Sequence, residues 1–140
     1  MLTTTRPHPR AADTTIRGAH LRALGLTKTY GMTRALDHID IAIPAGQSVA
    51  VMGPSGSGKT TLLHCLSGIL SPDSGSIELA MPDRTVNVEN LSNEGRAKLR
   101  RQSLGFVFQQ GMLVPELTAV ENTALPPMLN GVSRTDAVRY

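Results

Sequence analysis

Residues 53–61 read Gly53-Pro54-Ser55-Gly56-Ser57-Gly58-Lys59-Thr60-Thr61 and fit the pattern G-x-x-x-x-G-K-[ST]. The stretch before them, Ser48 to Met52, is nearly all apolar, as expected for a strand buried on both faces. The stretch after them, Thr60 to Ser67, has apolar residues at helical spacing and is followed by Gly68, a typical helix end. A strand, a glycine-rich turn and a helix in this order predict a loop that holds phosphate at the N-terminus of the helix.

The residue types in this loop suit the chemistry of a phosphate site. Its three glycines allow tight turns and a close approach of backbone N–H groups to a ligand. We expect Lys59 to reach the β- and γ-phosphates of a nucleotide and the hydroxyl of Thr60 to bind Mg²⁺. A glycine- and serine-rich linker could match by chance, but a linker need not follow a buried strand or place Lys-Thr in the first turn of an apolar helix. The loop alone leaves open a transporter ATPase, a GTPase or a small-molecule kinase.

The composition narrows the classes of protein further. At 140 residues the chain is one domain or part of one, and no apolar run approaches the length of a membrane span. The net charge of +3 comes from scattered basic residues, and with 3% aromatic residues and no Trp we expect no nucleic-acid partner. The single cysteine, Cys65, excludes an internal disulfide and suits a reducing compartment. It is interpreted as a small core residue, with a reactive thiol as the alternative.

The pattern of the N-terminal half predicts strands on both sides of the phosphate loop. Residues 1–18 are rich in Thr, Arg and Pro and are expected to be a disordered tail, with a transit peptide as the weaker reading. A strand is predicted over Leu21 to Tyr30 and another over His38 to Ile43, where apolar residues alternate. They indicate an antiparallel element beside a parallel core. Ser76 to Ala80 and Thr85 to Val88 are predicted to form a hairpin.

The C-terminal half is predicted to be mainly helical. Ser92 to Arg101 suits a polar helix capped by Ser92, and Leu104 to Phe108 suits another buried strand. Thr118 to Glu121 fits a capping box, and the helix it opens is expected to be interrupted at Pro126-Pro127. Ser133 is expected to cap a further helix.

Three features beyond the phosphate loop give the chain a family resemblance. Leu26 to Gly31 resembles the segment of ATP-binding cassette (ABC) transporter ATPases that carries an aromatic stacked on adenine, which makes Tyr30 the candidate. Ser74 to Ile77 resembles the turn and strand after the first helix of that family. Leu104 to Gln110 resembles its Q-loop, with Gln109 in the position of the glutamine that binds Mg²⁺ or the attacking water. In isolation, Tyr30 could be ordinary half-buried packing and Gln109 an ordinary loop residue.

The resemblance implies a fold, a ligand and partners. The fold is an α/β P-loop NTPase core, here partial, with an antiparallel β-subdomain and the start of a helical subdomain over residues 19–140. The ligands are ATP and Mg²⁺, bound at Tyr30, Gly53 to Thr61 and Gln109. Phe106 to Gln110 and residues 113–122 resemble the macrolide-exporter and lipoprotein-release branch, with the cell-division partner of that branch as the alternative. In such proteins Met112 to Leu117 would contact a membrane subunit, or would simply pack between subdomains. The family also implies a second ATP-binding subunit in a dimer and a place on the cytoplasmic face of the membrane.

The sequence departs from the family at its end. Nothing in it resembles the Leu-Ser-Gly-Gly-Gln signature, the Walker B strand or the switch histidine. We therefore expect a chain incomplete at its C-terminus, which binds Mg-ATP for export or release through a membrane subunit but has negligible hydrolysis by itself. The alternative is a truncated fragment without an independent fold.

Overall fold

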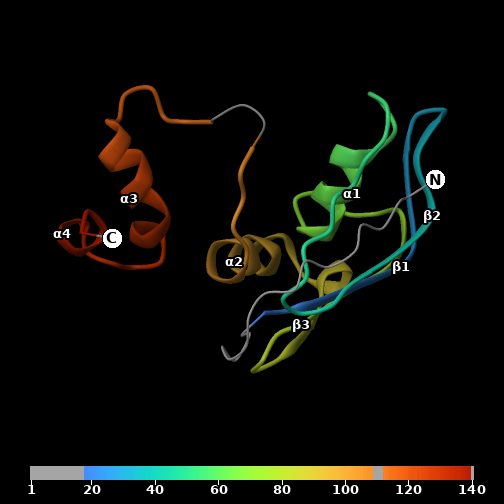
Figure 1. Cartoon of the computed structure of the whole chain (residues 1–140), viewed down its shortest axis with the longest axis horizontal. Helices are drawn as coiled ribbons and strands as arrows, with labels where there is room; N and C mark the ends of the chain where they lie inside the picture. Colours follow the sequence, from blue (N-terminus) through green and yellow to red (C-terminus); the bar gives the residue numbers. More distant parts are fainter. Residues whose placement is uncertain (1–17, 109–111, 140) are drawn as a thin grey trace. The chain divides into compact units, whose positions relative to one another are not determined.

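The computed structural model describes residues 18–108 and 112–139, so the predicted tail before Gly18 lies outside the described residues. The chain divides into two compact units, residues 1–92 and residues 93–140. The first unit contains the strands and the helix after the phosphate loop, and the second contains the remaining helices (Figure 1).

The first unit is built on an antiparallel sheet in the order β2-β1-β3-β4. Its strands are β1 (His20–Tyr30), β2 (Thr33–Ile43), β3 (Ser74–Ala80) and β4 (Thr85–Asn87), followed by a short 3-10 helix η1 (Val88–Asn90). The predicted hairpins β1–β2 and β3–β4 are confirmed, although β2 begins five residues before the predicted His38. The pairing of β2 with β1 is irregular between Leu36 and Ile39, and His38, which lies there, has a backbone φ of 48°.

The core of this unit lies between the sheet and α1 (Lys59–Leu66). Ile77 and Leu79 of β3 are buried while Ser76 and Glu78 are exposed, which is the period of two expected for a strand with one buried face. Burying each such apolar side chain contributes roughly 1.5–3 kcal/mol. The other buried apolar residues of the unit come from β1, β2, α1 and η1: Ala23, Leu26, Leu36, Leu62, Cys65, Leu66 and Val88.

The helix α1 forms as predicted because its apolar residues recur on one face and its end is capped by glycine. Leu62, Cys65 and Leu66 are buried at spacings of three and four residues. Gly68 has a φ of 67°, and the N–H groups of Ile69 and Leu70 both donate to the carbonyl of His64, at 2.9 and 3.0 Å.

The prediction of a strand over Ser48 to Met52 was wrong. Residues 47–53 form no strand, Met52 is 57% exposed, and Val49 and Val51 are only half-buried. A central parallel strand needs a hydrogen-bonded neighbour and cover on both faces. Among the described residues no strand pairs with this segment, so its apolar sequence is not enough to make it a strand.

The second unit contains α2 (Asn93–Ser103), α3 (Ala119–Leu129) and α4 (Arg134–Ala137). The helices predicted after Ser92 and Ser133 are confirmed, and the Ser133 hydroxyl accepts from the Asp136 N–H at 3.2 Å. The strand predicted over Leu104 to Phe108 was wrong. These residues are extended without a partner strand in the described part of the chain, and Val107 is fully exposed.

The predicted interruption at Pro126-Pro127 was also wrong, because α3 includes both prolines and ends at Leu129. A proline cannot donate a backbone hydrogen bond, but its carbonyl still accepts. The Asn130 side-chain amide donates to the Pro126 carbonyl at 3.2 Å, and the Asn130 N–H donates to the Pro127 carbonyl at 3.0 Å. These bonds close the last turn from its C-terminal side.

Candidate functional site

The phosphate loop has the backbone that its glycines predict. Gly56 and Gly58 have φ values of 77° and 83°, a left-handed conformation that side chains rarely adopt. A Cβ atom at Gly58 would lie 2.2 Å from the Ala35 carbonyl oxygen of β2. A Cβ atom at Gly53 would lie 2.8 Å from the Ser57 Oγ atom. The close approach of the loop to β2 therefore requires glycine at position 58, whereas the contact at Gly53 is with the end of the Ser57 side chain.

Lys59 is the first residue of α1, and its side chain turns back over the loop. The Nζ atom donates to the carbonyl oxygens of Gly53 at 2.9 Å and Pro54 at 2.6 Å, and it lies 3.4 Å from the Ser57 Oγ atom. The loop is tightened further by the Ser57 N–H, which donates to the Pro54 carbonyl at 3.3 Å. The Lys59 ammonium group thus binds two carbonyl oxygens of the loop. It lies at the N-terminus of α1, where the helix dipole is positive.

A hollow of about 230 Å³ lies where the loop, the start of α1 and β2 meet. Lys59 and the loop provide its polar wall, and side chains of β2 and α1 provide its apolar wall. Its lining residues are Ala35, Leu36, Ile39, Val51, Met52, Gly53, Pro54, Ser57, Gly58, Lys59 and Leu62. The loop residues Ser55 and Gly56, and Thr60 and Thr61 of α1, are not among them.

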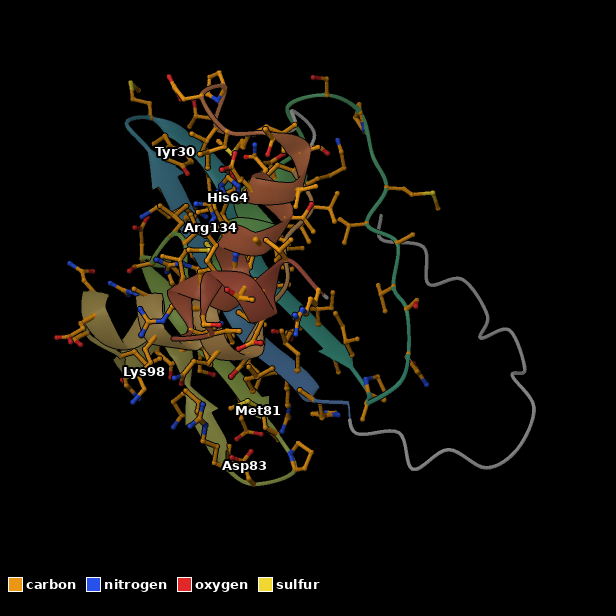
Figure 2. All side chains as sticks on the ribbon, turned by 90° about the vertical axis from the view of Figure 1, so that its left-hand side faces the viewer. Tyr30, His64, Met81, Asp83, Lys98 and Arg134 are labelled. Atoms are coloured by element: carbon orange, nitrogen blue, oxygen red, sulfur yellow. The ribbon has the colours of Figure 1, made fainter. Side chains whose placement is uncertain are left out.

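Thr60 and Tyr30 lie outside this hollow. Thr60 is exposed in the first turn of α1, so its hydroxyl is accessible to an ion from solvent. Tyr30 ends β1 opposite Thr33 and is 51% exposed. Figure 2 shows it at the end of the β1–β2 hairpin. The structure therefore brings five predicted site residues together around one hollow: Gly53, Pro54, Ser57, Gly58 and Lys59. Tyr30, the predicted adenine-stacking residue, does not line this hollow.

The candidate residues of the second unit are described only in part. Gln109 lies outside the described residues. Just before it, the rings of Phe106 and Phe108 stack with their centroids 5.8 Å apart. The segment from Met112 to Leu117 exposes apolar side chains, and the side chains of Met112, Leu113 and Val114 are all exposed.

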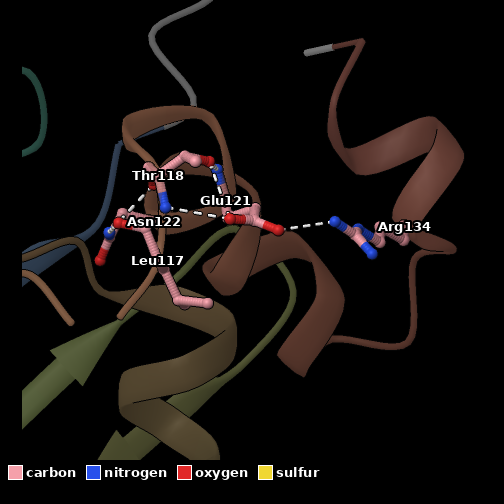
Figure 3. Close-up of polar contacts among 5 residues, drawn as sticks. All are labelled: Leu117, Thr118, Glu121, Asn122 and Arg134. Atoms are coloured by element: carbon pink, nitrogen blue, oxygen red, sulfur yellow. Dashed lines mark hydrogen bonds and ion pairs between the residues drawn. The ribbon is translucent and has the colours of Figure 1, made fainter. Parts of the chain in front are cut away.

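The capping box predicted at the start of α3 is confirmed. The Glu121 N–H donates to the Thr118 Oγ1 atom at 3.3 Å, and the Thr118 N–H donates to the Glu121 Oε2 atom at 2.9 Å. Hydrogen bonds from the backbone N–H and the hydroxyl of Thr118 hold the pKa of Glu121 below its usual value, with a smaller effect from Arg134. The other carboxylate oxygen of Glu121 accepts from Arg134 of α4 at 2.6 Å (Figure 3).

Sequence reasoning missed Asn122, which organises the segment before α3. Its Oδ1 atom accepts from the Val114 N–H at 2.8 Å. Its Nδ2 atom donates to the carbonyls of Val114 and Leu117 at 3.1 Å and of Thr118 at 3.0 Å, and Figure 3 shows the amide turned toward this turn. Its signals in the sequence were its place directly after the capping-box glutamate and its place at the end of the segment 113–122 that carries the branch resemblance.

Sequence reasoning also missed Asp73, in the loop between α1 and β3. Its carboxylate accepts from the Lys28 Nζ atom at 2.6 Å and from the Thr29 N–H at 2.7 Å. The hydrogen bond from Lys28, then that from Thr29, lowers the pKa of Asp73 below its usual value. The Ser-Pro-Asp-Ser-Gly composition predicted a loop here but gave no sign of these contacts.

A glycine-rich turn that opens a helix, with a lysine folded over its carbonyls beside an antiparallel sheet, defines the class of phosphate-loop nucleotide-binding proteins. Comparison with known proteins narrows this class. The ABC transporter family model matches residues 36–139, and the chain belongs to this family.

Curated relatives agree with the lipoprotein-release branch predicted from the sequence. The lipoprotein-releasing system ATP-binding protein LolD of Nitrobacter winogradskyi is 43% identical over 113 residues, which are 79% of this chain and 47% of that protein. The LolD protein of Legionella pneumophila is 46% identical over 102 residues, which are 73% of this chain and 43% of that protein. The family and the branch predicted from the sequence are confirmed.

A solved structure confirms the fold class. The ATP-binding cassette MJ0796, solved as a dimer bound to ADP and Pi, matches with a TM-score of 0.76 and 33% identity over 85% of this chain and 53% of that one. The chain spans about half the length of the relatives it matches. Within the described residues, no helix is both long and apolar enough to cross a membrane.

Proposed function

We propose that the chain binds Mg-ATP at residues 53–61 as the nucleotide-binding part of a transporter ATPase. The observation that carries this proposal is the position of Lys59, whose ammonium group lies over the loop carbonyls of Gly53 and Pro54. A cation held at the N-terminus of α1 favours an anionic group at that place. The glycines support a phosphate site because their left-handed backbones at positions 56 and 58 allow the tight turn that brings loop N–H groups toward an anion.

Each residue of the site has a distinct part in this proposal. The N–H groups of the loop and of the first turn of α1 hold the phosphates, and Lys59 exchanges its loop carbonyls for β- and γ-phosphate oxygens. The exposed Thr60 hydroxyl binds Mg²⁺, which neutralises charge on the phosphates. Tyr30 stacks on the adenine ring, since an exposed aromatic offers its face to a base. Gln109 contacts Mg²⁺ or the attacking water.

The partners follow from the same family membership. We propose that Met112 to Leu117 contacts an integral-membrane subunit at the cytoplasmic face of the membrane. The exposed apolar side chains of this segment and the four hydrogen bonds of Asn122 that hold it in one shape support this contact. The MJ0796 cassette is a dimer, which supports a second ATP-binding subunit as a partner. The relatives that are named for lipoprotein release support the proposal that ATP bound by this chain powers the release of a lipoprotein.

Nucleotide titration of a Lys59→Ala variant tests the proposal. Loss of charge-assisted hydrogen bonds to phosphate is expected to cost about 2–3 kcal/mol, or roughly a 30- to 150-fold weaker affinity for Mg-ATP. Lys98→Ala is the matched control, because it removes the same charge from an exposed position on α2. Equal affinities of the wild type and both variants would refute the site. A preference for GTP over ATP in competition would indicate a different class of P-loop protein.

A further inference from the structure

The last residues of β1 lie at an edge of the sheet. The strand β2 pairs with β1 as far as Tyr30, opposite Thr33. The strand β3 pairs with β1 only as far as Thr27, opposite Ser74. Beyond Thr27, the described strands therefore support β1 on one edge only.

Asp73 occupies the place where β3 would have to continue. Its N–H donates to the Thr27 carbonyl at 2.8 Å, and its Oδ2 atom accepts from the Thr29 N–H at 2.7 Å. Thr27 and Thr29 are two residues apart, so their backbone groups face the same edge of the strand. The Asp73 side chain thus adds one rung to the hydrogen-bond ladder, directly before Tyr30.

An ion pair strengthens this support. The Oδ1 atom of Asp73 accepts from the Nζ atom of Lys28 at 2.6 Å, and the Lys28 side chain is only 15% exposed. Such charge-assisted bonds are shorter and stronger than neutral ones. The contact therefore ties the end of β1 to the loop that leads into β3.

We propose that Asp73 is a positioning residue for the nucleotide base. By holding the backbone at Thr29, it fixes the direction in which Tyr30 presents its ring, while the phosphate loop holds the phosphates. The half-exposed Tyr30 ring is not packed into the core, so its place depends on the backbone that carries it. This inference rests on the proposed function and adds to it a residue that governs base recognition without touching the base.

Two ligands separate base recognition from phosphate binding. Affinities for Mg-ATP and for magnesium tripolyphosphate, which has no base, are measured for the wild type and for the Asp73→Ala, Tyr30→Ala and double variants. The ratio of the two affinities is the readout, because a change of charge or a loss of loop structure affects both ligands alike. Asp83→Ala is the matched control, since Asp83 lies at the β3–β4 turn, at the other end of the sheet from Tyr30 (Figure 2).

The expected result is a loss confined to ATP. Tyr30→Ala should lower the ATP affinity by about 5- to 150-fold, the range of base–aromatic stacking, and leave that for tripolyphosphate unchanged. Asp73→Ala should lower the ATP affinity by a smaller factor, roughly two- to tenfold, and should cause no further loss in the Tyr30→Ala background, as coupled residues do. The Asp83→Ala control should change neither affinity.

Other outcomes overturn the inference in distinguishable ways. Equal losses for ATP and tripolyphosphate, or additive losses in the double variant, would give Asp73 a structural role only. If Asp73→Ala does not fold, Asp73→Asn is measured instead; it loses the ion pair but keeps an acceptor for the Thr29 N–H, so the affinity ratio should stay near that of the wild type. A loss of the ratio as large as that of Tyr30→Ala would overturn the proposal. A wild type that binds both ligands equally would remove Tyr30 from base binding but leave the phosphate site intact. A wild type that binds neither would refute the proposed function itself.

Discussion

Replacing Gly58 by alanine should damage this protein far more than the same change at Gly56, although both residues are loop glycines with left-handed backbones. Their φ values are 83° and 77°, so a methyl group causes similar backbone strain at either position. They differ in their surroundings. The Cβ atom at Gly56 would meet nothing within 4 Å, whereas the Cβ atom at Gly58 would lie 2.2 Å from the Ala35 carbonyl oxygen.

The magnitudes follow from these contacts. Left-handed strain for a non-glycine residue costs about 1–2 kcal/mol, which is the whole expected effect of Gly56→Ala. At Gly58 the clash is with backbone of β2, and moving it by the missing 0.8 Å (3.0 minus 2.2 Å) disturbs the start of α1 as well. We expect a total of about 3–4 kcal/mol for Gly58→Ala, in the range of severe strain or overpacking. For a chain of this size this is a fall in melting temperature of roughly 12–16 °C, against about 4–8 °C for Gly56→Ala.

Urea denaturation followed by circular dichroism measures both variants against the wild type. Tripolyphosphate titration of the folded variants then shows whether the loop still holds phosphate. Because the two substitutions add the same methyl group to the same loop, their difference isolates the approach of the loop to β2. Equal destabilisation by Gly56→Ala and Gly58→Ala would refute the close contact between Gly58 and Ala35.

Three further predictions concern other parts of the chain. In a Tyr140→Phe chain, Tyr30 is the one remaining tyrosine and no tryptophan is present, so ATP should quench tyrosine emission while tripolyphosphate should not; no difference between the ligands would remove Tyr30 from base stacking. Asn122→Ala should destabilise by about 2 kcal/mol in urea denaturation, because backbone groups at the turn before α3 lose their partner, whereas the exposed control Gln102→Ala should stay within about 0.5 kcal/mol. The free energy of unfolding should stay constant from pH 7 to about pH 5 and should fall below about pH 4. The reason is that a carboxyl group with a lower pKa in the folded than in the unfolded state stabilises the fold while it is ionised. This stabilisation is lost as the pH falls through the pKa of the folded state. Three carboxyl groups have a lowered pKa: Asp37 through hydrogen bonds from His38 and Arg34, Asp73 through those from Lys28 and Thr29, and Glu121 through those from Thr118. A urea midpoint that is unchanged at pH 3 would contradict all three contributions.

Local sequence signals predicted the parts of the fold that are stabilised within a few residues of one another. The helix after the phosphate loop, the two hairpins and the caps at Thr118 and Ser133 are of this kind, and all are confirmed. Each depends on a turn residue, on a cap or on a pattern repeated every two or four residues. The phosphate loop itself belongs to this group, because its glycines and Lys59 are neighbours in the chain.

The failures came where an element depends on distant parts of the chain. Ser48 to Met52 and Leu104 to Phe108 have the composition of buried strands, but a strand exists only when another pairs with it, and none of the described residues does so. The helix continues through Pro126-Pro127, and Asn130 donates to the carbonyls of both prolines, a contact that residue propensity does not show.

The sequence by itself predicted the class of ligand, because a phosphate loop is a local pattern of backbone conformation and charge. Only the tertiary structure decided how that loop is held. The Gly58 position is set by a carbonyl of β2, twenty-three residues earlier in the chain (58 minus 35), and the end of β1 is held by Asp73, more than forty residues later. Such contacts form when hydrogen-bonding groups from distant segments meet across the sheet, and no periodicity in the sequence records which of them will meet.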